Sequence, residues 1–372
     1  MAIYYPKYDH SILGIVSSLL KSYGVASHHT GLTLLDSPLG RGHKNMIFLI
    51  LDGLGSEYFD QMLPIDSFLR RHKVTDLSSV YPCTTAAATT TLSSGLSPLE
   101  HGWLGWSPWF REYGRVIDLF LDRDSYSGAP VTPSPGPLLM PYQDIVSLIQ
   151  QAAGTGLEIN RLMPSFAPDG FGSLEAMLLR MREICQSDGR QLILAYWHQP
   201  DTLMHNEGPW SEAVRCDLEQ TDTLLGDLFQ SLDDALLIVT ADHGHITVER
   251  EIFLDEIPEL NDCLILPPSL ETRAVSLFVK PDCKAVFAAR FEDLLGDSFL
   301  LLPREEVFQR GLFGSGTPHR KVDDFIGDFL ACGIGNDIIR YHTPFNRPHT
   351  PFRGHHAGLR DEEMIVPLVI AE

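Results

Sequence analysis

The sequence predicts an α/β protein with a doubly wound, mainly parallel sheet and helices on both of its faces. Three apolar runs, at 46–51, 191–197 and 235–240, have the length and composition of strands that are buried on both faces. Stretches of helical periodicity precede the second and third runs, and such alternation of helix and buried strand is typical of parallel sheets. An aspartate or a histidine follows each run closely, at the strand ends where ligands gather in open α/β sheets.

Length and composition are those of an ordinary globular enzyme. With 372 residues, the chain can form one large domain with an insertion, or two domains. Its 28 Lys and Arg residues against 49 Asp and Glu residues give a formal net charge of −21. Proteins that bind nucleic acids need basic patches to neutralise phosphates, so no nucleic-acid polymer is expected as a partner.

The sequence also favours one cellular compartment. Its first residues lack a basic region followed by an apolar core, and no apolar run approaches the roughly 18 residues of a membrane span, so neither export nor membrane insertion is expected. The 6 cysteines include no C-x-x-C pair, which favours reduced thiols. We therefore expect a cytoplasmic protein.

The first two predicted elements are a helix and the central strand. Apolar residues between Ile12 and Tyr23 recur at helical spacing, which predicts an amphipathic helix that ends near Gly24. The strand 46–51 then ends at Asp52, and glycines directly after it allow the backbone to turn sharply there.

Thr85 begins the next predicted helix. The small residues 86–92 continue it, and Gly95 can end it as a C-terminal cap. A hydroxyl at the start of a helix lies near unpaired backbone N–H groups and can meet an anion such as phosphate. Taken alone, the run 46–51 is more simply interpreted as a buried strand, and Thr85 as an N-cap of the following helix.

Two further helices are predicted to lead into the remaining strands of the sheet. The proline-rich segment 129–141 is predicted as an extended surface connection, and ordered patterning resumes at 144–153. Ser173 and Ser211 are predicted N-caps of helices whose apolar stripes lead into the strands 191–197 and 235–240.

Beyond residue 261 the pattern changes. The segments 274–279 and 298–302 look like strands on either side of a helix at 286–295, with no acid or histidine at their ends. The predicted division is therefore a catalytic core at 1–261, a small inserted α+β cap at 262–322, and a return to the core at 323–372, where 327–332 rejoins the main sheet. The glycine-rich stretch 311–319 lacks the lysine and the strand-turn-helix context of a P-loop, so a loop at the cap's edge is expected.

Five short motifs lie in a fixed order between residues 49 and 359: LILDGLG, T-x9-G followed by L-x-P-x-x-H-G, Y-x4-D-x3-H-x2-GP, ADHG and GHHAGL. Together they resemble the nucleotide pyrophosphatase/phosphodiesterase branch of the alkaline phosphatase superfamily. The resemblance implies an alkaline-phosphatase-like fold and a metal-dependent hydrolase of phosphoesters, most of all phosphodiesters, with a small-molecule substrate.

Several candidate metal ligands have suitable spacing. Asp201 and His205 are four residues apart, so they share one face if a helical turn begins at Asp201. Asp242 and His243 are adjacent just past a strand end. Either pair alone is an unremarkable surface pair. The resemblance implies that two divalent ions are bound, the first by Asp201, His205 and His356, and the second by Asp52, Asp242, His243 and the Thr85 hydroxyl.

Mixed nitrogen and oxygen ligands suit zinc first, with manganese as the alternative. His245 and His355 lie beside proposed ligands, and we expect them to orient those ligands or to face solvent.

The resemblance also implies that Thr85 is the nucleophile and forms a phosphothreonine that water then cleaves. Thr85 is preferred over neighbouring threonines because only its ten-residue spacing to Gly95 matches the family motif.

The chain departs from the nucleotide-cleaving members at a few positions. These members have Pro-Asn-His after the nucleophile and a phosphate-binding asparagine further on, where this chain has 86–88 and Trp106; Gln199 stands where relatives often have glutamate. Trp103, Trp106 and Trp109 could stack on a flat leaving group, although core packing is the commoner role of such residues.

Other functions compete with a phosphodiesterase. The C-x-P-x-R motif of sulfatases is missing, and the cofactor-independent phosphoglycerate mutases use serine and a longer chain. A phosphomonoesterase, a phosphonate hydrolase or a phosphomutase-like enzyme on the same site stays open. A catalytically silent metal-binding protein is the last alternative.

Overall fold

A six-stranded sheet forms the centre of the larger lobe in the computed structural model, which describes residues 3–342 and 350–372. Strands β1, β6, β7 and β8 are parallel, whereas β17 runs antiparallel to both of its neighbours. The order across the sheet is β2 (Lys73–Ser78), β17 (Ile365–Ala371), β8 (Ala235–Thr240), β1 (Asn45–Leu51), β7 (Arg190–Trp197) and β6 (Leu157–Leu162). The predicted doubly wound, mainly parallel sheet is confirmed.

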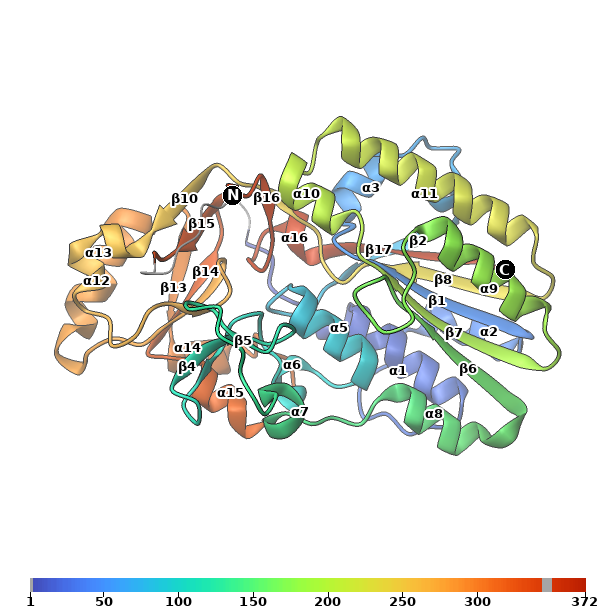
Figure 1. Cartoon of the computed structure of the whole chain (residues 1–372), viewed down its shortest axis with the longest axis horizontal. Coiled ribbons are helices and arrows are strands. Elements are labelled where there is room, and N and C mark those ends of the chain that lie inside the picture. The colour runs from blue at the N-terminus through green and yellow to red at the C-terminus, as the bar shows by residue number, and fades with distance from the viewer. Residues whose placement is uncertain (1–2, 343–349) are drawn as a thin grey trace.

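Helices cover both faces of this sheet, and in Figure 1 α3, α10 and α11 lie on one side of it while α1, α5 and α8 lie on the other. The strands are apolar almost throughout because neither face meets water. The helices of this lobe are α1 (Ile12–Ser22), α2 (Asp36–Gly40), α3 (Ser56–Met62), α4 (Phe68–His72), α5 (Thr85–Ser94), α6 (Pro98–His101), α8 (Ile145–Ala153), α9 (Leu174–Gln186), α10 (Asp201–Glu207), α11 (Glu212–Gln230) and α16 (Asp361–Met364).

Side-chain caps start the helices that lead into the sheet. The Ser173 hydroxyl accepts a hydrogen bond from the backbone N–H of Ala176 at 3.2 Å, and the Ser211 hydroxyl accepts one from Val214 at 3.3 Å. Both predicted N-caps are confirmed. Each cap satisfies an N–H group that the first turn of a helix leaves without a partner.

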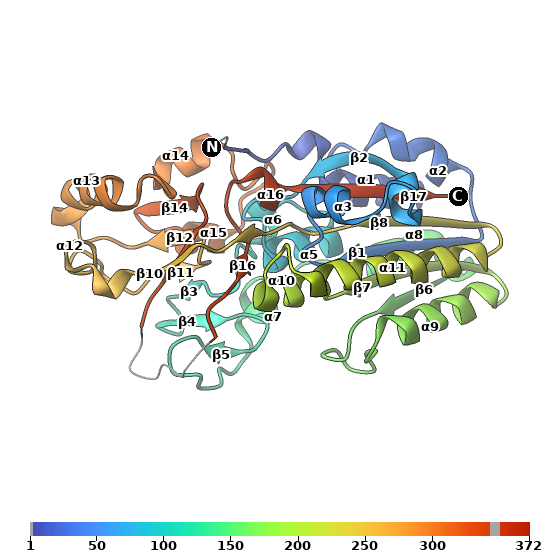
Figure 2. The same cartoon turned by 90° about the horizontal axis from the view of Figure 1, so that it is seen from above.

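The smaller lobe is built on a second, antiparallel sheet. Its order is β11 (Ser269–Leu270), β12 (Ala274–Leu277), β14 (Phe329–Gly333) and β13 (Phe299–Pro303), with a separate pair of β10 (Arg250–Phe253) and β15 (Asp337–Arg340) beside it. Its helices are α12 (Pro258–Asn261), α13 (Lys284–Leu295), α14 (Arg304–Gln309) and α15 (Arg320–Phe325). Figure 2 shows this lobe beside one end of the large sheet.

The position of β14 corrects one prediction. Residues 327–332 were expected to rejoin the main sheet, but β14 lies between β12 and β13 in the second sheet. The chain rejoins the main sheet only at β17. The apolar pattern of β14 identifies a buried strand, but it carries no information about which sheet the strand joins.

Irregular segments connect the two lobes. They contain the short strands β3 (Trp109–Phe110), β4 (Arg115–Asp118) and β5 (Arg123–Asp124), the pair β9 (Ile246–Thr247) and β16 (Gly354–His355), and α7 (Pro135–Leu139). The proline-rich segment 129–141 is therefore not extended throughout, because α7 occupies part of it. Within the described residues, no helix combines the length and the apolar character that crossing a bilayer requires.

Candidate functional site

Asp52, Asp201 and Asp242 meet at the carboxyl ends of three neighbouring strands. Residue Leu51 of β1 pairs with Trp197 of β7, so Asp52 lies beside the start of α10, where Asp201 is the first residue. Asp242 follows β8, which pairs with the other edge of β1. The topology of the parallel sheet thus brings together carboxylates that are far apart in the sequence.

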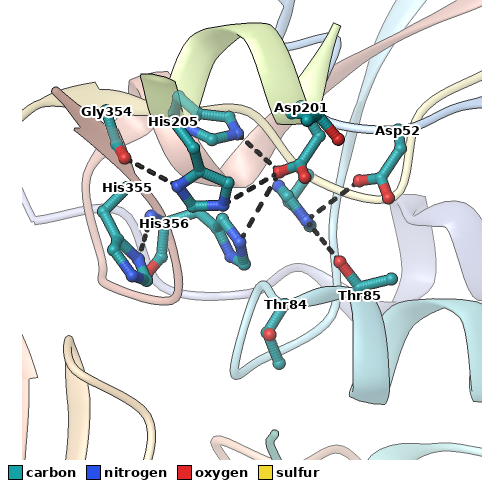
Figure 3. A network of polar contacts seen from close by, with 12 residues as sticks. Asp52, Thr84, Thr85, Asp201, His205, Gly354, His355 and His356 are labelled. Carbon is teal, nitrogen blue, oxygen red and sulfur yellow. Dashed lines mark hydrogen bonds and ion pairs between the residues drawn. The ribbon is translucent and has the colours of Figure 1, made fainter. Parts of the chain in front are cut away.

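Four histidine rings and the Thr85 hydroxyl complete the cluster. Figure 3 shows the side chains of His205, His356 and Thr85 directed toward Asp201 and Asp52. Asp201 Oδ1 lies 3.3 Å from His205 Nε2 and 3.8 Å from His356 Nε2. His243 Nε2 lies 3.3 Å from Asp52 Oδ1 and 3.2 Å from Thr85 Oγ1. Asp242 Oδ2 lies 3.6 Å from His243 Nε2. The structure thus brings together all of the residues predicted for the site.

Backbone carbonyls orient three of the histidines in the same way. The Nδ1 atom of His205 donates to Gly354 O at 2.8 Å, that of His243 to Gly244 O at 3.0 Å, and that of His356 to Cys83 O at 3.1 Å. Because a carbonyl can only accept, Nδ1 carries a proton, and Nε2 is left as the ring nitrogen that can offer a lone pair to a metal ion. Metal-binding histidines are commonly oriented by such a hydrogen bond from the other ring nitrogen.

The spacing of the ligand atoms also suits an ion. Atoms that bind one tetrahedral zinc at about 2.0–2.1 Å lie about 3.3 Å from each other. Asp201 and His205, like Asp52 and His243, have this separation.

Burial and mutual repulsion shift the charges of the cluster. Burial raises the pKa of Asp52 well above its usual range, and the neighbouring carboxylates of Asp242 and Asp201 raise it further. Burial alone would raise the pKa of Asp201 too, but His205 holds it well below its usual value. Burial lowers the pKa of His356 well below that of free imidazole, so this ring is neutral, as a metal ligand must be.

The residues present therefore fit divalent ions. Asp52 Oδ1 and Asp242 Oδ2 are buried and accept no hydrogen bond. Among the described residues, no lysine or arginine forms an ion pair with any of the three aspartates, whose ionic partners are histidines. Buried carboxylate oxygens that accept no hydrogen bond are costly, and a bound cation would remove that cost.

Thr85 is the first residue of α5, and the N-cap is Thr84 rather than Thr85. Helix α5 ends at Gly95, whose φ of +71° is the left-handed conformation predicted for the cap. The Thr84 hydroxyl makes no capping bond and donates to Glu271 Oε1 at 2.7 Å instead. The first N–H groups of α5 therefore receive no capping hydrogen bond from the Thr84 side chain.

A family comparison decides the relationship of the chain. The model of the type I phosphodiesterase/nucleotide pyrophosphatase family matches residues 46–288. The chain belongs to this family. It is accordingly a hydrolase of phosphoester bonds in a metal-dependent family, and its Asp and His clusters are candidate metal sites. No curated protein sequence matches the chain significantly.

Solved structures agree on the fold. Murine ectonucleotide pyrophosphatase/phosphodiesterase 5 in complex with AMP has a TM-score of 0.65 at 20% identity, over 87% of each chain. The human protein of the same name has a TM-score of 0.65 at 19% identity, over 88% of this chain and 87% of that chain. Phosphonoacetate hydrolase from Sinorhizobium meliloti, in complex with phosphonoacetate, has a TM-score of 0.61 at 17% identity, over 88% of this chain and 90% of that one.

Three residues beside this phosphodiesterase-family site were missed or underrated by the sequence analysis. The Tyr196 hydroxyl donates to Asp52 Oδ2. His245 Nε2 lies 2.8 Å from Asp201 Oδ1, so His245 belongs to the ligand-atom cluster, although the sequence analysis left it outside the ligand set. Glu271 reaches the site from the smaller lobe. Tyr196 is near the end of a predicted strand, which was an available signal, whereas nothing local distinguished Glu271.

A buried ion pair supports the loop that carries His356. Arg273 Nε lies 2.7 Å from Glu363 Oε1, and both side chains are fully buried. The backbone N–H of Gly358, two residues after His356, also donates to Glu363 Oε1 at 2.7 Å. This pair thereby fixes the GHHAGL segment against the second sheet.

Glu363→Gln is expected to lower the free energy of unfolding by about 3–5 kcal/mol, because it leaves the Arg273 charge buried without its counter-charge. Urea denaturation would measure the change. Glu183→Gln is the matched control, since Glu183 pairs with Arg180 at 2.9 Å on an exposed helix face and should cost less than about 1 kcal/mol. Equal effects of the two substitutions would contradict a supporting role for the buried pair.

Two cavities meet at Thr85. The first has a volume of about 650 Å³ and the second about 560 Å³, and Thr85, Trp106 and Asp201 line both. The wall of the first cavity is mainly apolar and includes Phe48, Ile50, Trp103, Phe120, Phe166 and Leu194. The wall of the second cavity is also mainly apolar, but it includes more charged side chains, among them Asp118, Arg123, Glu271 and Arg340.

The tryptophans differ in their roles. Trp103 is 9% exposed and donates from Nε1 to Met140 O at 3.0 Å, yet one face of it lines the first cavity. Trp106 is 37% exposed and lines both cavities. Trp109 lines neither cavity. Gln199 accepts a hydrogen bond from the backbone N–H of Leu203 at 3.1 Å and so supports the first turn of α10.

Proposed function

We propose that the chain is a phosphodiesterase that acts through a phosphothreonine at Thr85. The observation that supports a diester is the meeting of two cavities at this hydroxyl. A phosphodiester has two ester groups, one for each cavity, whereas a monoester would leave one cavity without a substituent. The apolar walls of the first cavity suit an aromatic or aliphatic ester group.

Two divalent ions are part of the proposal, with zinc as the first choice and manganese as the alternative. Asp201, His205 and His356 would hold one ion, and Asp52, Asp242, His243 and Thr85 would hold the other. Bound ions would lower the pKa of a hydroxyl or a water molecule and offset charge on the phosphoryl oxygens.

The chain's own groups prepare the reaction. Thr85 Oγ1, at the start of α5, attacks phosphorus as one ester oxygen leaves, and water then hydrolyses the phosphothreonine. The N–H groups at the start of α5 donate to the phosphoryl oxygens and stabilise their charge. Tyr196 holds Asp52 by donating to its second oxygen, so that Oδ1 stays directed into the cluster.

One related protein supports the role of a threonine. The murine enzyme in complex with AMP is an inactive variant in which a threonine is replaced by alanine. Because the chain is also similar in structure to phosphonoacetate hydrolase, hydrolysis of a phosphonate is an alternative to test.

A substrate screen of the metal-loaded protein tests the proposal. Bis(p-nitrophenyl) phosphate, p-nitrophenyl phosphate, p-nitrophenyl sulfate and phosphonoacetate would be compared by kcat/KM. We expect the diester to exceed the monoester by at least about tenfold, because only the diester fills both cavities. The reverse ranking would favour a phosphatase or mutase. Cleavage of phosphonoacetate alone would favour a phosphonate hydrolase, and no turnover at full metal occupancy would favour a silent metal-binding protein.

A further inference from the structure

Glu271 brings a carboxyl group from the smaller lobe to the nucleophile. It follows β11, and its Oε1 accepts hydrogen bonds from the Thr84 hydroxyl and from the backbone N–H of Trp106, both at 2.7 Å. These two donors flank Thr85 and the boundary between the cavities. Since Oε1 is fully engaged, Oε2 is the oxygen left to face the second cavity, which Glu271 lines together with Thr85.

The backbone around Glu271 is built for this approach. Leu270 and Ser107 exchange two backbone hydrogen bonds, at 2.8 and 3.0 Å, which join the smaller lobe to the segment after α6. A Cβ on Gly105 would lie 2.9 Å from Leu270 O and 3.1 Å from Glu271 Cγ, so only glycine allows this contact. Leu270 has a φ of +87°, a strained conformation for a non-glycine residue. Such strain persists where the surroundings over-determine a conformation, and it clusters at functional sites.

The charge of Glu271 is not neutralised nearby. Among the described residues, no lysine or arginine forms an ion pair with it. The second cavity is also lined by Asp201 and His205 of the ligand-atom cluster, by Asp118, which pairs with Arg123 at 3.0 Å, and by Arg340, which lies 3.8 Å from Glu251. Burial raises the pKa of Glu271 to about 7, while the Thr84 and Trp106 donors and His205 favour the ionised form and Asp118 opposes it.

We propose that Glu271 selects phosphodiesters over phosphomonoesters by placing an unpaired carboxylate in the second cavity beside Thr85. This inference rests on the proposed phosphodiesterase function. A diester carries one negative charge on its phosphoryl group and presents an uncharged ester arm to this cavity. A monoester presents an oxygen with a second negative charge, which the carboxylate repels. Well above pH 7, where Glu271 is ionised, the monoester can bind only by displacing Glu271 or by protonating it, and either costs free energy.

Glu271→Gln tests this role. The glutamine carbonyl can keep both hydrogen bonds to Oε1, so the local structure is retained while the charge is removed. In assays well above pH 7, where Glu271 is ionised, we expect the ratio of kcat/KM for the diester to that for the monoester to fall by about tenfold or more, through a rise in the monoester value. Inorganic phosphate should also become a stronger competitive inhibitor of the variant.

Two matched variants separate charge from structure. Thr84→Val removes one hydrogen bond to Glu271 but keeps the carboxylate, so selectivity should persist. Glu183→Gln removes the same charge on an exposed face of α9 and should not change the ratio. An unchanged ratio in Glu271→Gln, or equal losses for both substrates, would overturn the proposal. If the wild-type protein itself prefers the monoester, the phosphodiesterase function fails instead.

Discussion

Thr85→Ala is expected to lower phosphodiester turnover by roughly 10³-fold or more, because residual catalysis would then depend on water reaching the same in-line position without a covalent intermediate. The six carboxylate and imidazole ligands proposed for the ions remain in this variant, so metal content should persist. Steady-state kinetics on a chromogenic diester and elemental analysis of the same sample would measure both quantities.

Neighbouring threonines provide the controls. Thr85→Ser keeps the oxygen and loses only the methyl group that restricts its rotamer, so it should retain a measurable fraction of the turnover. Thr89 donates its hydroxyl to Thr85 O at 2.6 Å and Thr84 donates to Glu271, so neither hydroxyl is directed at the cluster. Substitution of either by alanine should be much milder.

Acid quenching during turnover should trap phosphate on Thr85, which mass spectrometry of proteolytic fragments can locate. Near-normal turnover by Thr85→Ala would indicate direct attack by water. Trapped phosphate on Thr84 would mean that the nucleophile is one residue earlier than proposed here.

The second large effect is expected from Asp242→Asn. Asp242 Oδ1 accepts backbone hydrogen bonds from Gly53 and His243, both at 3.1 Å, while Oδ2 accepts none. An asparagine can keep its oxygen in the first position, but its amide would then place a donor where the free carboxylate oxygen lies. The variant should therefore fold normally and bind about one zinc ion per chain instead of two, with turnover lowered by about 100-fold or more.

Metal content and stability can be followed without an activity assay. Zinc at 100 times its Kd should raise the free energy of unfolding of the wild type by about 2.7 kcal/mol for each ion, and the gain should be smaller for the variant. His355→Gln is the control, because His355 lies near Thr272 Oγ1 and outside the ligand-atom cluster. Two ions retained by Asp242→Asn, or none bound by the wild type after loading with zinc or manganese, would contradict the proposed metal site.

The elements of the larger lobe could be predicted because their signals are local. A continuous apolar run indicates a strand covered on both faces, and the run 46–51 corresponds to β1 (Asn45–Leu51) at the sheet centre. Apolar periodicity, a serine before the first turn and a glycine after the last turn are likewise properties of a few consecutive residues. They identify α1, α5, α9 and α11 with nearly the observed bounds.

Which strands and side chains contact one another in the folded protein leaves no such local signal in the sequence. The apolar stretch of β14 is equally suited to either sheet, and its residues do not specify its place between β12 and β13. The proline-rich segment 129–141 is predicted to be extended, but the short helix α7 lies within it.

For this protein, the sequence by itself determined the strand ends that carry Asp52, Asp201 and Asp242, because the end of an apolar run is a local property. The tertiary structure alone decided which atoms face one another across the site. His356 is oriented by Cys83, 273 residues away, and Glu271 reaches Thr84 across 187 residues. Hydrophobic periodicity reports whether a side chain is buried, but not what it is buried against, so contacts of this range depend on how the two lobes pack together.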